Sequence, residues 1–77
     1  MRIAFDPAHR VERAKEFLSE LLAPGPVEVR NIRRAATNAG WSAGVGWAAI
    51  KHARRELGLI AFRQKGAWYW GWPDATA

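Results

Sequence analysis

Residues 47–59, WAAIKHARRELGL, decide the fold of this chain. On a helix with about 3.6 residues per turn, one side carries Ile50, Ala53 and Leu57, with Trp47 and the stem of Arg54 at its margin. The opposite side has a small side chain in its first turn and mostly basic ones afterwards. It consists of Ala48, Lys51, His52 and Arg55. The pattern predicts an amphipathic helix over residues 46–57 that rests on a small aliphatic core. Its outer side would be either solvated or in contact with an anionic partner.

A β-hairpin is predicted directly after this helix. Gly58 can end the helix, because glycine accepts the left-handed conformation that a helix C-terminus often requires. Residues 59–72 then alternate between two sides, as the side chains of paired strands do. The turn of the hairpin consists of Gln64, Lys65 and Gly66. The tip of the predicted hairpin is therefore basic.

Four of the five tryptophans lie outside the predicted helices. Trp68, Trp70 and Trp72 fall on one side of the return strand, and we expect them to cover the helical core. The alternative is that some of them stack on bases or fill a protein groove. Trp41 lies in a loop, where it would either close the domain or form an exposed anchor for a partner.

Two further helices are predicted before residue 46. The first covers residues 7–22 and begins at Asp6-Pro7, where the carboxylate can cap the helix. A proline-rich turn at residues 24–26 ends it, and Val27 forms a short edge strand or an extended entry. The second helix covers residues 28–38. Three helices followed by a hairpin predict one α+β domain over residues 1–77, a winged helix-turn-helix with its wing at residues 59–72 and a tail at 73–77.

Charge is distributed unevenly along the chain. The net charge is +5, yet residues 1–26 carry four basic and four acidic groups and are neutral. Residues 27–77 carry eight basic groups against three acidic ones. Such asymmetry suits a polyanion, although it also serves solubility or an acidic protein partner.

The predicted winged helix gives these basic groups definite positions on double-stranded DNA. The helix at 46–57 would enter or follow a major groove, the preceding helix would hold phosphates, and the wing would reach the neighbouring backbone. From these three elements the candidate DNA-binding residues are Ala48, Lys51, His52 and Arg55, then Arg30, Arg33 and Arg34, then Arg63 and Lys65.

Catalysis, cofactor binding and metal binding find little support in the sequence. The G-x-S-x-G pattern at residues 40–44 matches a hydrolase nucleophile elbow, but a helix is predicted before it and the chain is too short for the required sheet. The acidic pairs among Glu12, Glu16 and Glu20 read as a solvated helix face. His9 and His52 are isolated, and there is no cysteine. We therefore expect no enzyme, no cofactor and no metal.

The sequence also bears on the compartment of the protein. The absence of cysteine suits a reducing cytoplasm, and no apolar run approaches the roughly 18 residues of a membrane span. We expect a cytoplasmic protein with no membrane partner. The oligomeric state is left open by the sequence.

Three segments carry a resemblance to a known family. They are ERAKEFLSELLAPGPVEVRNIRRAATNAG at residues 12–40, ARRELGL at 53–59 and AWYWGWP at 67–73. Together they resemble the winged helix-turn-helix domain at the C-terminus of phage, prophage and plasmid primase-helicases, which are AAA-type replication ATPases. The resemblance implies a DNA-binding module of phage or mobile-element origin, active in replication or transcription regulation, without catalysis of its own.

A second functional class stays open beside DNA binding. A free-standing phage-type protein on this fold could be a protein-interaction or inhibitor module, such as an anti-defence protein that binds a host complex. Large aromatic side chains would then serve as its anchors. The candidates are Trp41, Trp68 and Trp70.

Overall fold

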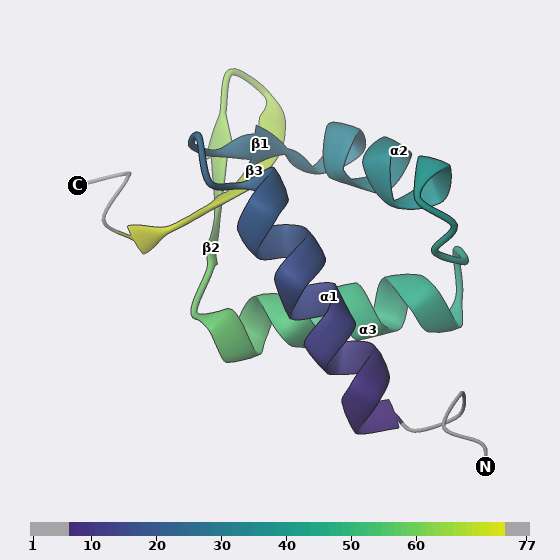
Figure 1. Cartoon of the computed structure of the whole chain (residues 1–77). Helices are drawn as coiled ribbons and strands as arrows, with labels where there is room; N and C mark the ends of the chain where they lie inside the picture. Colours follow the sequence, from purple (N-terminus) through teal and green to yellow (C-terminus); the bar gives the residue numbers. More distant parts are fainter. Residues whose placement is uncertain (1–6, 74–77) are drawn as a thin grey trace, which may run out of the picture.

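The computed structural model describes residues 7–73, which form three helices and a three-stranded antiparallel sheet in a winged-helix layout (Figure 1). The expected cap Asp6 and residues 74–77 of the predicted tail lie outside the described residues. The elements are α1 (Pro7–Leu21), β1 (Val27–Glu28), α2 (Val29–Asn38), α3 (Val45–Leu57), β2 (Ile60–Gln64) and β3 (Ala67–Gly71). The α+β class and the three predicted helices are thus confirmed.

One hydrophobic core joins α1 to α3 and the sheet to α2. The four largest of its completely buried side chains each contribute roughly 1.5–3 kcal/mol of burial free energy. They are Leu18, Leu22, Ile32 and Ile50. The predicted inner side of α3 is confirmed, since Ile50 and Ala53 are buried and Leu57 packs against the cluster. Ala49 is buried as well, on the side of α3 that packs against α1, where it lines the same hollow as Val11.

The glycine at the end of α3 sets the direction in which the wing leaves the helix. Gly58 has a φ of 79°, and its N–H donates to the carbonyl of Arg55 at 3.1 Å. The N–H of Leu59 donates to the carbonyl of Arg54, also at 3.1 Å. This pair of bonds is a Schellman motif, which satisfies two terminal carbonyls. It also turns Leu59 into the core, where 4% of its surface is exposed.

The same turn ends α2. Gly40 has a φ of 96°, and its N–H donates to the carbonyl of Thr37 at 3.0 Å. The N–H of Trp41 donates to the carbonyl of Ala36 at 2.9 Å. Because the residue after the glycine is folded back over the helix, Trp41 is directed onto the domain.

The central strand of the sheet is β3, which pairs with both β1 and β2. Val27 is opposite Trp70, so of the two alternatives for Val27 the structure shows the short edge strand. Glu28 is opposite Tyr69 and has an extended backbone, with φ −64° and ψ 137°. The prediction that Glu28 begins the second helix is therefore wrong, because pairing with β3 holds its backbone in the strand.

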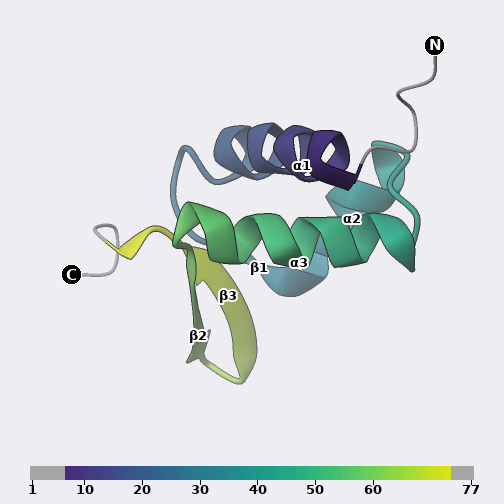
Figure 2. The same cartoon turned by 90° about the horizontal axis from the view of Figure 1, so that it is seen from below.

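The tryptophans of the C-terminal segment have different environments. Trp70 is buried, and Trp72 packs against the core, so the prediction that they cover the core is confirmed for both. Trp68 is 51% exposed, and for this residue the prediction is wrong. The hairpin projects past the helices, so that its far end has no helix beneath it (Figure 2).

The left-handed conformation of Gly58 predicts that a substitution there lowers the stability of the fold. An added Cβ at Gly58 meets nothing within 4 Å, so any cost of Gly58→Ala comes from the left-handed backbone alone. We expect this substitution to lower the free energy of unfolding by about 1 kcal/mol, measured by chemical denaturation. Gly58→Asn should lose less, since asparagine tolerates this conformation better. Equal stability of Gly58→Ala and the parent would contradict the assignment.

Candidate nucleic-acid interface

Carboxylates are segregated from the surface on which the predicted contact residues lie. Residues 29–73 contain eight Lys or Arg residues and a single acidic one, Glu56. The acidic residues of α1 are Glu12, Glu16 and Glu20, on the helix that lies across α3. The helix α2, the helix α3 and the hairpin therefore form an almost exclusively cationic half of the domain.

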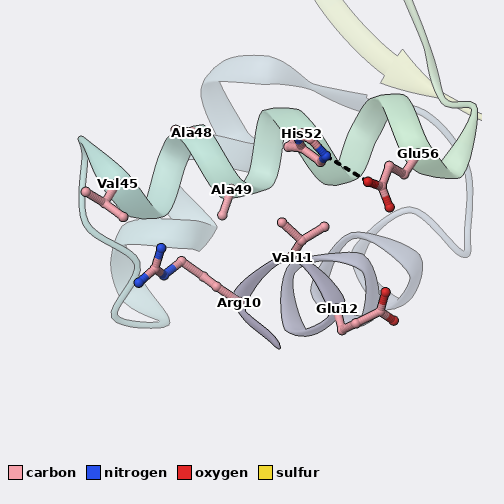
Figure 3. A pocket seen from close by; sticks show the side chains of 8 residues that line it. All are labelled: Arg10, Val11, Glu12, Val45, Ala48, Ala49, His52 and Glu56. Atoms are coloured by element: carbon pink, nitrogen blue, oxygen red, sulfur yellow. Dashed lines mark hydrogen bonds and ion pairs between the residues drawn. The ribbon is translucent and has the colours of Figure 1, made fainter. Parts of the chain in front are cut away.

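The single carboxylate of α3 is directed toward α1. Oε1 of Glu56 lies 2.7 Å from Nζ of Lys15, which is also 3.1 Å from Oε2 of Glu12. The other oxygen of Glu56 lies 2.7 Å from Nε2 of His52, as Figure 3 shows. The hydrogen bond from Lys15, followed by that from His52, lowers the pKa of Glu56. Its hydrogen bonds to Glu56 and Glu12 raise the pKa of Lys15.

This ion-pair cluster leaves the outer ridge of α3 without a negative charge. Ala48, Lys51 and Arg55 are exposed, as the sequence predicted, and follow one another along the ridge at helical spacing. In Figure 2, α3 crosses the front of the molecule and no other helix covers it. The methyl group of Ala48 leaves room for a close approach to the first turns of the helix.

His52 belongs to a different side of α3 from Lys51. Its imidazole lies beside a hollow of about 510 Å³ between α1 and α3, together with Glu56 and Val11 (Figure 3). The side chain is 54% exposed but is held by the carboxylate of Glu56. The predicted contact residue His52 is therefore directed toward α1 rather than along the ridge.

The arginines of α2 are exposed, and one of them reaches α3. The side chain of Arg30 is 78% exposed and lies 4.0 Å from Glu28. Arg34 is exposed on the same helix. The guanidinium of Arg33 lies over the indole of Trp47, 4.8 Å from its centroid. Because Trp47 precedes Lys51 by one turn of α3, this contact brings a cation of α2 beside the ridge.

The wing supplies two further cations. Lys65 lies in the turn with a φ of 53°, and both it and Arg63 are exposed. Arg63 is opposite Trp68 across the two strands, with its guanidinium 6.0 Å from the ring centroid. Within residues 7–73, six of the predicted cations have no ion pair, namely Arg33, Arg34, Lys51, Arg55, Arg63 and Lys65.

Two of the predicted protein anchors are packed into the domain. Trp70 is 6% exposed, with the guanidinium of Arg54 at 5.3 Å from its ring centroid, so the prediction that Trp70 is an anchor is wrong. Trp41 is half-buried against Phe17, at 6.0 Å between ring centroids. Of the two alternatives for Trp41, the structure therefore supports closure of the domain.

The serine of the G-x-S-x-G pattern has a structural role at the start of α3. Its hydroxyl, Oγ of Ser42, accepts a hydrogen bond of 2.8 Å from the N–H of Gly46. An added Cβ at Gly46 would lie 3.1 Å from that oxygen and 3.2 Å from the backbone of Trp41. The pattern follows the helix α2 rather than a strand, so its context differs from that of a nucleophile elbow.

Comparison with known proteins adds no relative. No family model, no curated protein and no solved structure matches the chain. In the part of the chain that the structure describes, no helix is long and apolar enough to span a membrane. Residues 7–73 also contain no group of three or more side chains placed to hold a metal ion.

The ion pairs of Glu56 predict a defined response to acid. Because its pKa in the folded state is lowered from 4.5, the ionised carboxylate stabilises the fold above that pH, and this contribution is lost as the pH falls through the lowered value. We expect Glu56→Gln to flatten the fall in melting temperature below about pH 4.5.

A matched control is Glu16→Gln, which removes an exposed carboxylate of α1 that makes no ion pair within residues 7–73. It should leave the acid profile of the parent unchanged. Identical profiles for the parent and Glu56→Gln would contradict the assigned role of Glu56.

Proposed function

We propose that this domain binds double-stranded DNA. The exposed ridge of α3 lies in or along the major groove, with Lys51 and Arg55 on phosphates or base edges and Ala48 allowing close approach. The arginines of α2 and the cations of the wing hold the flanking backbone. Cations on three elements, rather than on one helix alone, would then position the domain on the DNA.

The observation that carries the proposal is the distribution of unpaired cations. Six of the predicted ones are exposed on α2, α3 and the wing without an ion pair in the described residues, while Glu56 is held by Lys15 on the α1 side. Arg10 and Arg13 of α1 also make no ion pair there, but they share their helix with three carboxylates, whereas α2 and the hairpin carry none. A surface built for solubility alone would not need this segregation, because mixed charges serve solubility equally well. A surface with several exposed arginines and a single carboxylate, which is ion-paired, is the pattern that a polyanion favours.

The resemblance of residues 12–73 to the C-terminal domains of primase-helicases supports a setting for this activity. We infer a role in the replication or gene regulation of a phage or another mobile element. The work of such a module would be to bring an attached or associated machine to DNA. It would not itself perform chemistry.

Docking on a host protein is the less favoured candidate. It depended on three aromatic anchors, of which Trp70 is buried and Trp41 is packed on Phe17. Only Trp68 remains exposed among them. A protein interface ordinarily has several anchor residues clustered at its centre, and one exposed ring does not form such a cluster.

A titration with a labelled random-sequence duplex tests the proposal, with fluorescence anisotropy read at several salt concentrations. About six phosphate contacts predict that log K falls with log salt at a slope of about −5. Lys51→Ala combined with Arg55→Ala should weaken binding at low salt and reduce that slope by about 2. No binding at low salt would overturn the proposal.

The matched control is Arg10→Ala combined with Arg13→Ala, which removes the same charge from α1. If net charge alone drives association, both double variants lose affinity equally. The proposal requires that the α1 variant retain most of the affinity while the α3 variant does not.

A further inference from the structure

Trp68 is the one tryptophan among residues 7–73 for which packing offers no explanation. Trp47 and Trp70 stack on each other and are buried, while Trp41 and Trp72 pack against the core cluster. Trp68 is 51% exposed and is not part of that cluster. An exposed indole on a projecting hairpin adds little to the stability of the fold, so its apolar surface is available to a ligand.

The two faces of the hairpin differ in how their aromatic rings are used. Tyr69 points to the face opposite Trp68, because successive side chains of a strand alternate. There it stacks on Phe62, with 5.7 Å between ring centroids and 14° between ring planes. Those two rings therefore partner each other, whereas Trp68 has a single ring or cation contact among the described residues, which is with Arg63.

The charged side chains of the hairpin that carries Trp68 are all positive, and Glu28 of the neighbouring strand lies opposite Tyr69, on the other face of the sheet. Arg63 lies opposite Trp68 on β2, and Lys65 occupies the turn one position beyond the last strand pair, Gln64 with Ala67. Residues 60–71 contain no acidic side chain. An exposed indole beside two cations, with no carboxylate, can stack on a nucleobase while the cations meet its phosphate.

An intact duplex cannot use this site easily. The faces of its bases are covered by neighbouring bases, and inserting a side chain between them costs unstacking free energy. An unpaired nucleotide next to a duplex presents its base without that cost. The wing extends from one end of α3 on the side away from α1 (Figure 2). Trp68 lies on the same face of β3 as Trp70, which stacks on Trp47 of α3, so the exposed indole is on the face of the hairpin that is turned toward this helix.

We propose that the wing binds an unpaired nucleotide adjoining the duplex, with its base stacked on Trp68 and its phosphate held by Arg63 or Lys65. This inference rests on the proposed DNA binding and makes it more specific. The preferred substrate is duplex DNA with a single-stranded extension, as at an end or a fork, rather than a continuous duplex.

The test compares three labelled probes with one duplex sequence. The first is blunt, the second carries a short single-stranded thymidine tail, and the third carries an abasic tail with the same number of phosphates. Because the two tails differ only in their bases, electrostatic attraction cancels in their comparison. We expect the thymidine tail to bind about fivefold or more tightly than the abasic tail. Both tail polarities are measured, and a preference for either supports the inference.

Trp68→Ala should abolish this preference while leaving affinity for the blunt duplex within about twofold, and Trp68→Phe should retain part of it. The melting temperature of each variant is measured in parallel, and Trp68→Phe decides the matter if Trp68→Ala unfolds. Equal binding of both tails by the parent would overturn the inference and leave duplex binding intact. A preference that survives in folded Trp68→Ala would also overturn it, and so would an equal loss on all three probes.

Failure of the parent to bind any of the three probes would instead overturn the proposed function itself. The exposed indole would then point to a protein partner. The two failures are therefore distinguished by the blunt duplex, which reports on α3 without requiring an unpaired base.

Discussion

The stacking of Trp47 on Trp70 holds together the elements on which the proposed DNA binding depends. The rings are 5.5 Å apart between centroids and 13° from parallel, and they join α3 to the central strand β3. Arg33 of α2 lies over the first ring and Arg54 over the second. One aromatic pair with its two guanidinium groups thus links the helix, its neighbour and the wing. Aromatic pairs and cation–π contacts of this kind add roughly 0.5–2 kcal/mol each to ordinary burial.

This linkage explains how so small a domain can present cations on three elements without losing their arrangement. The core is made largely of aliphatic side chains from α1, α2 and α3, and the tryptophan stack extends it to the sheet. The charge of the ridge is set separately, by the ion pairs that direct Glu56 to Lys15. The position of the cations therefore depends on apolar contacts, whereas their freedom from carboxylates depends on electrostatic ones.

Much of the fold was predictable because the turn and cap residues and the spacing of the hydrophobic residues indicate the same elements. The glycine after α3, the alternation of the hairpin and the spacing of Ile50 and Ala53 all indicate the same structure. The pairing of Glu28 with Tyr69 was not predictable, because a two-residue strand has no periodicity and Glu28 equally suits the first turn of a helix. Glu28 adopts the strand conformation because it pairs with β3, which lies some forty residues later in the chain.

The site was predictable as a set of exposed cations and not as a geometry. Exposure of Lys51 and Arg55 follows from the helical wheel. The direction of His52 does not, because it depends on Glu56 and on the neighbouring helix α1. The alternation that places Trp68 and Trp70 on one side could not show where the core ends along the strand. That limit is set by the length of the hairpin relative to the helices.

The central claim is that DNA meets the ridge of α3 and the cations beside it. Nitrogen–proton NMR spectra of the labelled domain, recorded while a short duplex is added at low salt, test this directly. The account predicts the largest shift changes at the amides of Ala48, Lys51 and Arg55 and at the wing turn, with the amide of Glu16 on α1 unchanged. Changes concentrated along α1, or none at all with duplex in excess, would contradict it.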